Sequence, residues 1–346
     1  MATHGRVVGM WYRESAGAAL LQPLAWLYGW IVGLRKLAYS HGWLRSLRVD
    51  KPVIVVGNLT VGGTGKTPVV AWLATQLTAR GLKVGIVSRG YGRTAGRVPR
   101  IVAADSDWRE VGDEPLLLRR LTGCDTVVAP DRHAGAQLLV ERGADVILAD
   151  DGLQHLRMAR DCEIVVIDGA RGFGNGRLLP AGPLREPVRR LATVRLIIVN
   201  GAAESASLQG FRFPDSATVL QMTLAGDEVV RVDGLEAPRT LESFRGERVH
   251  AVAGIGNPQR FFGELRARGL DVIEHAFADH HPFVASELSF PDGLPVLMTE
   301  KDAVRCRPLA HARLWSVPVT ARFGERQSRE LLESVTRSLG PTAAGR

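Results

Sequence analysis

The string TVGGTGKT at residues 60–67 constrains the fold of this chain more than any other segment. It follows an apolar, β-branched run at residues 52–58 and precedes a helical pattern from residue 68 to 80 that ends at Gly81. A strand, a glycine-rich loop and a helix in this order are typical of a phosphate-binding loop. Glycines let backbone N–H groups turn toward phosphate oxygens, and the helix N-terminus adds a positive dipole.

Each position of this loop has an expected role. Lys66 is expected to reach the β- and γ-phosphates of ATP as a catalytic residue, and Thr67 to offer its hydroxyl to Mg²⁺. ATP and Mg²⁺ are therefore the expected cofactors. One position departs from the usual pattern, because Thr60 stands where a glycine is normally found. The candidate nucleotide-binding residues are Thr60, Val61, Gly62, Gly63, Thr64, Gly65, Lys66 and Thr67.

Further apolar runs alternate with helical patterns along the chain, which predicts a doubly wound parallel α/β sheet. Strands are expected at residues 84–87, 126–129, 144–149, 162–167 and 194–199, and helices at 116–121 and 131–142.

Acidic residues follow the strand expected at 144–149. Ligands bind at the carboxyl ends of parallel strands, so Asp150 and Asp151 are candidate Mg²⁺ ligands. Glu114 is a further candidate, and which of the two aspartates contacts the metal stays open. The alternative is that Asp151 and Gly152 form a simple turn.

Two other polar motifs are candidates for acid–base chemistry. Asp113 stands just before an expected helix, where it is either a helix cap or the base that accepts a proton from a hydroxyl group. His280 and His281 follow Asp279, and an imidazole beside a carboxylate orients it or tunes its pKa. Two adjacent histidines with no third ligand do not predict a zinc site.

The N-terminal segment is apolar and rich in aromatic residues, with no charged residue from 15 to 34. Pro23 interrupts the run and its aromatics are scattered, which favours a helix lying in a membrane interface. A spanning helix and a buried core helix are the alternatives. Basic residues that follow, such as Arg35 and Lys36, suit an anionic cytoplasmic leaflet.

The amino-acid composition limits the classes of partner and metal site that are expected for this chain. The net charge is +8, but it comes from scattered arginines without the interleaved aromatics of a nucleic-acid site, so nucleic acid is not expected. The three cysteines are far apart, which argues against a disulfide framework or a cysteine zinc site and favours a reducing compartment.

Four segments are expected. They are a membrane-associated helical segment at 1–48, the phosphate-loop core at 49–217, a β-hairpin linker at 218–233, and a smaller α/β domain at 234–346. The hairpin is expected because residues 218–232 alternate around Gly226 and Asp227. The string GIGNP at 254–258 lacks the GK[ST] ending and is interpreted as a packing turn. Closure of the smaller domain over the phosphate loop would bring His280 toward Asp113.

Several strings combine into a family pattern. They are VVGNLTVGGTGKTP, SRGYGR, GDEP, DDGLQH, RGFGNGRLLPAGPLREP, GIGNPQRFF, DHHPF and TEKDAVR. With the N-terminal apolar segment, they resemble the tetraacyldisaccharide 4′-kinase family of Gram-negative bacteria as far as about Arg305. The resemblance implies transfer of the γ-phosphate of ATP to the 4′-hydroxyl of tetraacyldisaccharide 1-phosphate, which yields lipid IVA. It also implies peripheral or monotopic attachment to the cytoplasmic face of the bacterial inner membrane.

The same resemblance implies site residues. An Asp–His catalytic pair would fall on Asp113 and His280. The expected contacts to the lipid-linked disaccharide are Arg93, Arg132, Arg185, Glu186 and Lys301. Arginine suits bidentate phosphate binding, and surface ion pairing is the alternative. No obligate protein partner is expected.

Two other function classes compete with this interpretation. Membrane-associated regulatory or metallochaperone NTPases have similar loops, but they often carry an early lysine where this chain has Thr60 and Val61. A non-catalytic membrane adaptor would not need the intact Lys66 and Thr67.

Overall fold

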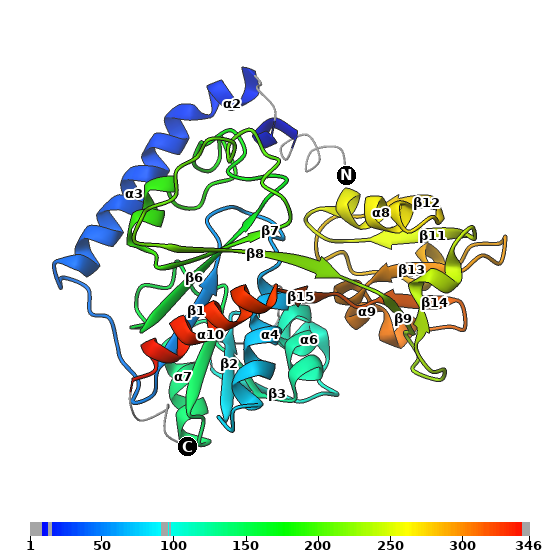
Figure 1. Ribbon diagram of the computed structural model, residues 1–346, viewed down its shortest axis with the longest axis horizontal. Coiled ribbons are helices and arrows are strands. Elements are labelled where there is room, and N and C mark those ends of the chain that lie inside the picture. Colours follow the sequence, from blue (N-terminus) through cyan, green and yellow to red (C-terminus); the bar gives the residue numbers. More distant parts are fainter. Residues whose placement is uncertain (1–8, 13–15, 91–95, 97, 341–346) are drawn as a thin grey trace.

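The computed structural model describes residues 9–12, 16–90, 96 and 98–340. Two sheets organise this part of the chain (Figure 1). The larger has the strand order β15-β8-β7-β6-β1-β5-β2-β4-β3, and the smaller has the order β10-β9-β14-β13-β11-β12.

The larger sheet is parallel except at its two edges. Its strands are β1 (Val53–Gly57), β2 (Val84–Ser88), β3 (Arg100–Val102), β4 (Asp125–Val128), β5 (Val146–Asp150), β6 (Cys162–Asp168), β7 (Leu196–Asn200), β8 (Thr218–Ala225) and β15 (Thr320–Arg322). Only β3 and β15 pair in the antiparallel sense among them. Every strand expected between residues 52 and 199 is present, because each is a short apolar run that the parallel sheet buries on both faces.

Helices cover both faces of this sheet. They are α4 (Lys66–Thr78), α5 (Trp108–Val111), α6 (Asp113–Thr122), α7 (Arg132–Glu141) and α10 (Glu325–Ser338), with a short 3₁₀ helix at Val188–Thr193. Leu73 of α4 packs in one core with Ile54 of β1, while Leu139 of α7 packs with Val55 on the opposite face. Burial of a side chain such as Leu73 contributes about 1.5–3 kcal/mol. Asp131 caps α7 by accepting a hydrogen bond from the His133 N–H.

The smaller sheet contains β9 (Glu228–Arg231), β10 (Arg239–Thr240), β11 (Arg248–Ala253), β12 (Asp271–Ala276), β13 (Val296–Thr299) and β14 (Leu314–Val317). Helix α8 (Pro258–Ala267) packs on one face through Phe262, and α9 (Glu300–Cys306) packs on the other through Cys306. Short 3₁₀ helices occur at Leu241–Phe244, Ala285–Glu287 and Arg307–Leu309. These strands and helices form a second α/β unit beside the larger one.

The prediction of a β-hairpin at residues 218–233 is wrong. Strand β8 pairs with β7 and β15 in the larger sheet, whereas β9 pairs with β10 and β14 in the smaller one. The chain passes from one sheet to the other after Ala225, as Figure 1 shows. Alternation of apolar and polar residues reports which face of a strand is buried and does not identify its partner.

The expected boundary of the second domain is also wrong at its C-terminal end. After β14 the chain returns to the larger sheet through β15 and α10. Leu331 and Val335 of α10 lie in the same core as Leu73 and Ile54. The segment from Thr320 to Ser338 therefore packs with the phosphate-loop core, because the apolar face of α10 is buried there.

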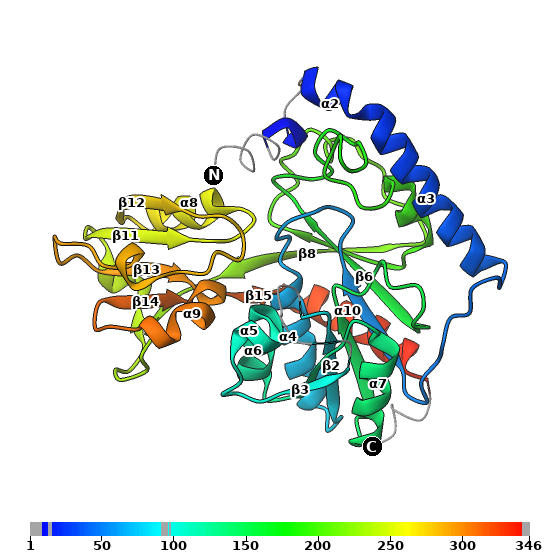
Figure 2. The ribbon, with the colours of Figure 1, turned by 180° about the vertical axis from the view of Figure 1, so that it is seen from behind.

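Helices α2 (Ala16–Leu20) and α3 (Gln22–Ser40) run along the outside of the larger domain (Figures 1 and 2). Ala25 is the one buried residue of α3, so the buried-core alternative is wrong. The exposed apolar side chains of this segment are Leu20, Leu24, Trp26, Leu27, Trp30, Ile31, Leu34 and Leu37. In the part of the chain that the structure describes, no helix has the length and apolarity needed to cross a bilayer.

Candidate active site

The phosphate loop joins β1 to α4, and two of its glycines have positive φ. Gly62 has φ of 106° and Gly65 has φ of 94°, conformations that side chains rarely adopt. Thr60 needs no such freedom, because the described non-glycine residues with positive φ are Asp151 and His280. Thr60 instead forms an antiparallel bridge with Leu184. The loop therefore tolerates threonine in place of the usual glycine at position 60, because Thr60 has an extended backbone that pairs with Leu184.

Lys66 opens α4 and faces the end of β5. Its Nζ lies 3.4 Å from Oδ1 of Asp151, and Nη1 of Arg185 lies 2.9 Å from Oδ2 of the same carboxylate. Burial raises the pKa of Asp151, but the Lys66 and Arg185 charges outweigh it, so the pKa lies well below its usual range. Asp151 is therefore an ionised carboxylate that orients two cations beside the loop.

Asp150 has different surroundings. Its side chain is 1% exposed, and Ser88 Oγ donates to its Oδ2 at 3.3 Å. Its Oδ1 has no hydrogen-bond partner. Burial, with the nearby charges of Glu114 and Asp151, raises the pKa of Asp150 to about 7. A carboxylate with one free oxygen and a raised pKa is one that a cation would stabilise in its ionised form.

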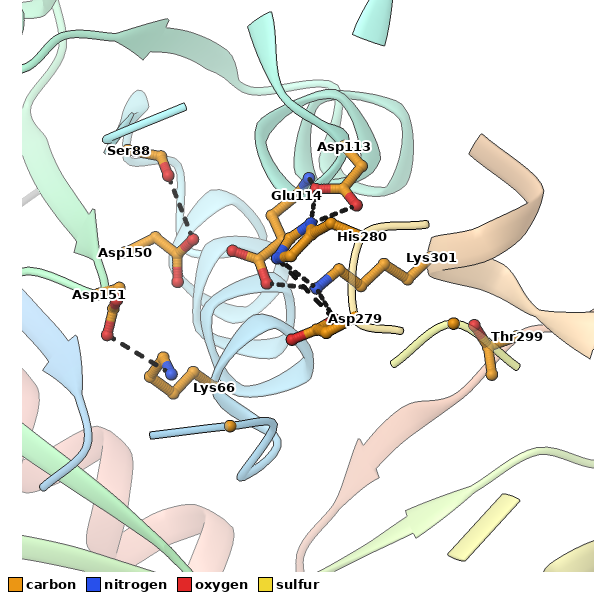
Figure 3. A network of polar contacts seen from close by, with 12 residues as sticks. Lys66, Ser88, Asp113, Glu114, Asp150, Asp151, Asp279, His280, Thr299 and Lys301 are labelled. Carbon is orange, nitrogen blue, oxygen red and sulfur yellow. Dashed lines mark hydrogen bonds and ion pairs between the residues drawn. The ribbon is translucent and has the colours of Figure 1, made fainter. Parts of the chain in front are cut away.

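Asp113 and His280 come from different domains and meet at the seam between them (Figure 3). Asp113 is the first residue of α6, and His280 follows β12 in the other domain. The Nδ1 atom of His280 lies 2.9 Å from Oδ2 and 3.1 Å from Oδ1 of Asp113. The N-cap of α6 is Gly112, and Asp113 follows it in the first turn, where its Oδ1 also accepts the Glu114 N–H at 2.9 Å.

The two partners differ in burial and in charge. Asp113 is 3% exposed and the side chain of His280 is 22% exposed. Burial alone would raise the pKa of Asp113, but the His280 hydrogen bond and the charges of Lys301 and Arg305 hold the pKa well below its usual range. Burial works against protonation of His280, yet the Asp113 hydrogen bond outweighs it and raises the pKa of the imidazole. The imidazole is thus the better proton acceptor of the pair.

Lys301 closes this cluster from α9. Its Nζ lies 3.0 Å from Glu114 Oε1, 3.3 Å from His280 Nε2 and 3.4 Å from Asp279 Oδ1 (Figure 3). Burial opposes its charge, but Glu114, Asp113 and Asp279 together raise the pKa of Lys301. Glu114, a candidate Mg²⁺ ligand, is therefore paired with an ammonium group here, and its charge also acts on Asp150.

The remaining expected substrate contacts lie in three settings. Arg132 is buried and donates to the carbonyl oxygens of Asp150 and Asp151 at 3.5 and 3.4 Å, so it supports the end of β5. Glu186 is also buried and accepts from Gln154 at 3.0 Å. Arg93 lies outside the described residues.

Sequence reasoning missed the contacts between the smaller domain and the phosphate loop. Arg171 donates to Gly63 O at 2.5 Å and to Gly256 O at 3.2 Å, so it bridges the two glycine loops. Asn200 donates to Thr64 O at 3.0 Å and accepts from Arg260 at 3.0 Å. The position of Asn200 at the end of β7 was the one available signal.

The sequence matches a known protein family over most of its length. The family described as tetraacyldisaccharide-1-P 4′-kinase matches residues 17–337. The chain belongs to the tetraacyldisaccharide 4′-kinase family. This membership disfavours the regulatory or metallochaperone NTPase alternative, and the family description names a kinase.

Curated relatives and a solved structure agree with the family. A tetraacyldisaccharide 4′-kinase of Alkalilimnicola ehrlichii is 54% identical over 317 residues, covering 92% of each chain. One from Xanthomonas euvesicatoria is 49% identical over 320 residues, also covering 92% of each. The crystal structure of the Aquifex aeolicus family member in complex with ATP has a TM-score of 0.77 and 29% identity, and the match covers 93% of this chain and 99% of that one.

The contact between the two glycine loops gives a first testable expectation. A Cβ on Gly256 would lie 2.9 Å from the Gly63 backbone nitrogen, too close for either loop to keep its place. We expect Gly256→Ala to raise the KM for ATP about tenfold with a smaller change in kcat, measured by steady-state kinetics. The control is Gly263→Ala on α8, where an added Cβ meets nothing within 4 Å. Equal KM values for the two variants would contradict the expectation.

Proposed function

We propose that this protein transfers the γ-phosphate of ATP to the 4′-hydroxyl of tetraacyldisaccharide 1-phosphate, forming lipid IVA. Family membership across residues 17–337 supports the substrate. The single observation that carries the chemistry is the Asp113–His280 pair, joined at 2.9 Å across a seam whose other groups include Lys301. Phosphoryl transfer to an alcohol needs a phosphate cradle and a proton acceptor, and this site has candidates for both.

The phosphate cradle is proposed to be residues 60–67. Gly62, Gly63 and Gly65 turn backbone N–H groups toward the phosphates, and Lys66 exchanges its contact with Asp151 for the β- and γ-phosphate oxygens. The crystal structure of the Aquifex aeolicus relative is a complex with ATP, which supports the nucleotide.

The residues beside the loop fit Mg²⁺. Asp150 has an unpartnered, buried Oδ1, and Thr67 lies in the first turn of α4. Among the residues that the structure describes, no three acidic, histidine or cysteine side chains form a metal cage. Mg²⁺ seldom requires one, since it keeps waters and uses one or two carboxylates with the substrate phosphates. We propose Asp150 and Thr67 as its holders, where the ion would neutralise phosphate charge.

The proton of the 4′-hydroxyl is proposed to pass to the Asp113–His280 pair. With its Nδ1–H donating to Asp113, the imidazole presents Nε2 as the acceptor, and the buried carboxylate stabilises the imidazolium that forms. Asp113 alone is the poorer acceptor, because its cationic neighbours keep its pKa low. The Nζ of Lys301 lies 3.3 Å from Nε2, and its charge offsets part of the effect of Asp113 on the pKa of His280.

The acceptor lipid is proposed to approach along α3. Tyr28 Oη of α3 donates to the Arg185 carbonyl at 3.0 Å, so the exposed apolar helix is tied directly to a residue of the site. Arg185 is the proposed contact for a phosphate of the substrate, where its planar guanidinium suits bidentate binding. We propose that the helix lies in the cytoplasmic leaflet of the inner membrane with Trp26 and Trp30 in the interface.

The membrane proposal predicts a specific loss. Replacing both Trp26 and Trp30 with serine is expected to weaken binding to phosphatidylglycerol-containing vesicles about tenfold or more, because each tryptophan loses its apolar burial. Co-sedimentation with vesicles measures the change. The control is Leu235→Ser, which removes an even more exposed apolar side chain from the smaller domain. Equal binding by the two variants would count against the assignment of this helix.

Transfer of label from [γ-³²P]ATP to the lipid fraction tests the proposed function. We expect labelling with tetraacyldisaccharide 1-phosphate and none with a 4′-deoxy analogue of the same lipid. Label released only as inorganic phosphate in both reactions would favour the NTPase alternative.

A further inference from the structure

Arg305 is a fully buried cation at the seam between the two domains. It lies on α9, its side chain is 0% exposed, and Asp113 on α6 is one of its two ion-pair partners. The other is Asp302, one turn earlier on α9. Burying a charge is costly unless it is paired and hydrogen-bonded, so a guanidinium in this place needs a specific arrangement of partners. The ring of Phe283 covers it at 5.7 Å.

A third contact of Arg305 connects it to His280, the hydrogen-bond partner of Asp113. Its Nη2 donates to Gly254 O at 3.1 Å, and the same carbonyl accepts the backbone N–H of His280 at 3.1 Å. His280 has φ of 60°, a strained conformation that a residue other than glycine rarely adopts. The Gly254 carbonyl is therefore part of what holds His280 in a strained conformation.

Asp302 fixes the same segment from the other side. Its Oδ2 accepts the Gly254 N–H at 3.1 Å and the Thr299 hydroxyl at 2.5 Å, while its Oδ1 pairs with Arg305. Gly254 thus donates one hydrogen bond to Asp302 and accepts one from Arg305. A Cβ at Gly254 would meet Asp302 Oδ1 at 3.1 Å, so the glycine permits this close approach.

We propose that Arg305 is a positioning residue for phosphoryl transfer, which holds the Asp113 carboxylate and the His280 backbone in register across the domain seam. The inference rests on the proposed function, because it gives the Asp113–His280 pair the proton-accepting role. Arg305 touches neither nucleotide nor lipid in this account. It acts through two contacts that a single point charge cannot reproduce, since one arm of the guanidinium reaches Asp113 and the other reaches Gly254.

The test compares Arg305→Met with Arg307→Met, an exposed arginine two residues further along. We expect Arg305→Met to lower kcat about 100-fold, as a misplaced reacting group does, with the KM for ATP within about threefold of wild type. Loss of the cation also leaves the Asp113 charge free to act on His280, so the acid limb of kcat/KM is expected to move to higher pH. Arg305→Lys is expected to recover part of kcat.

A double-mutant cycle separates positioning from general support of the fold. On an Asp113→Asn background, Arg305→Met is expected to cause little further loss of kcat, because the group it positions is already disabled. A full further 100-fold loss, or an Arg305→Met enzyme as active as Arg307→Met, would overturn the proposal. If Arg305→Met does not fold, Arg305→Lys replaces it against Arg307→Lys, with at least a tenfold lower kcat expected and equal values overturning the proposal. Absence of transfer by the wild-type enzyme would instead refute the proposed function.

Discussion

Replacing Lys66 with alanine is expected to lower kcat at least about 1,000-fold. The lysine is largely buried at the start of α4, where its Nζ lies 3.4 Å from Asp151. In the proposed reaction it neutralises charge on the β- and γ-phosphates, and preorganised charges of this kind contribute about 10²–10³ or more in rate. Steady-state transfer to tetraacyldisaccharide 1-phosphate measures the loss.

The control for Lys66 is Lys83→Ala. Lys83 is exposed and donates to Arg142 O at 2.6 Å on the surface. We expect its kcat within about twofold of wild type. Comparable activity in the two alanine variants would show that the phosphate loop does not carry the reaction.

Replacing Asp113 with asparagine is expected to lower kcat about 10²–10⁴-fold with little change in the KM for ATP. The amide keeps the shape of the carboxylate but removes the charge that orients His280 and stabilises its protonated form. Because Asp113 and His280 are proposed to act as one unit, the double variant with His280→Ala is expected to be no slower than the slower single variant.

The same variant is also expected to shift the pH dependence of kcat/KM in a defined direction. Asp113 raises the pKa of His280, and the proposed reaction requires the neutral imidazole, so wild-type kcat/KM is expected to be lost as the pH falls through that raised pKa. In Asp113→Asn the pKa of His280 falls and the acid limb moves to lower pH. Asp105→Asn, an exposed change on the loop before α5, serves as the control. A shift in the same direction for both, or none for either, would contradict the assigned pair.

Local patterns determined how much of this structure was predictable. The strands of the larger sheet and the phosphate loop were readable, because buried β-branched runs and a glycine-rich turn carry their signals in adjacent residues. The partner of β8 and the packing of α10 were not, since both depend on contacts between distant segments. Leu331 belongs to an apolar helix face that could have covered either domain.

The residues of the candidate site also fall into those that local sequence patterns predicted and those that depend on contacts between distant segments. Lys66 and Thr67 followed from spacing, whereas the approach of Asp113 and His280, 167 positions apart, came from family resemblance. The structure places them 2.9 Å apart, and their catalytic roles remain predictions. Arg305 and Arg171 carry no local signal, because a buried arginine is defined by the groups it pairs with and those lie far away in the sequence.

The most direct test of the central claim is the product itself. Purified protein is incubated with ATP, Mg²⁺ and tetraacyldisaccharide 1-phosphate, and the lipid product is examined by mass spectrometry and ³¹P NMR. We predict a gain of one phosphate, placed on the 4′-oxygen, in wild-type protein and not in Lys66→Ala. Consumption of ATP with the lipid recovered unchanged, or a phosphate at any other position, would contradict the account.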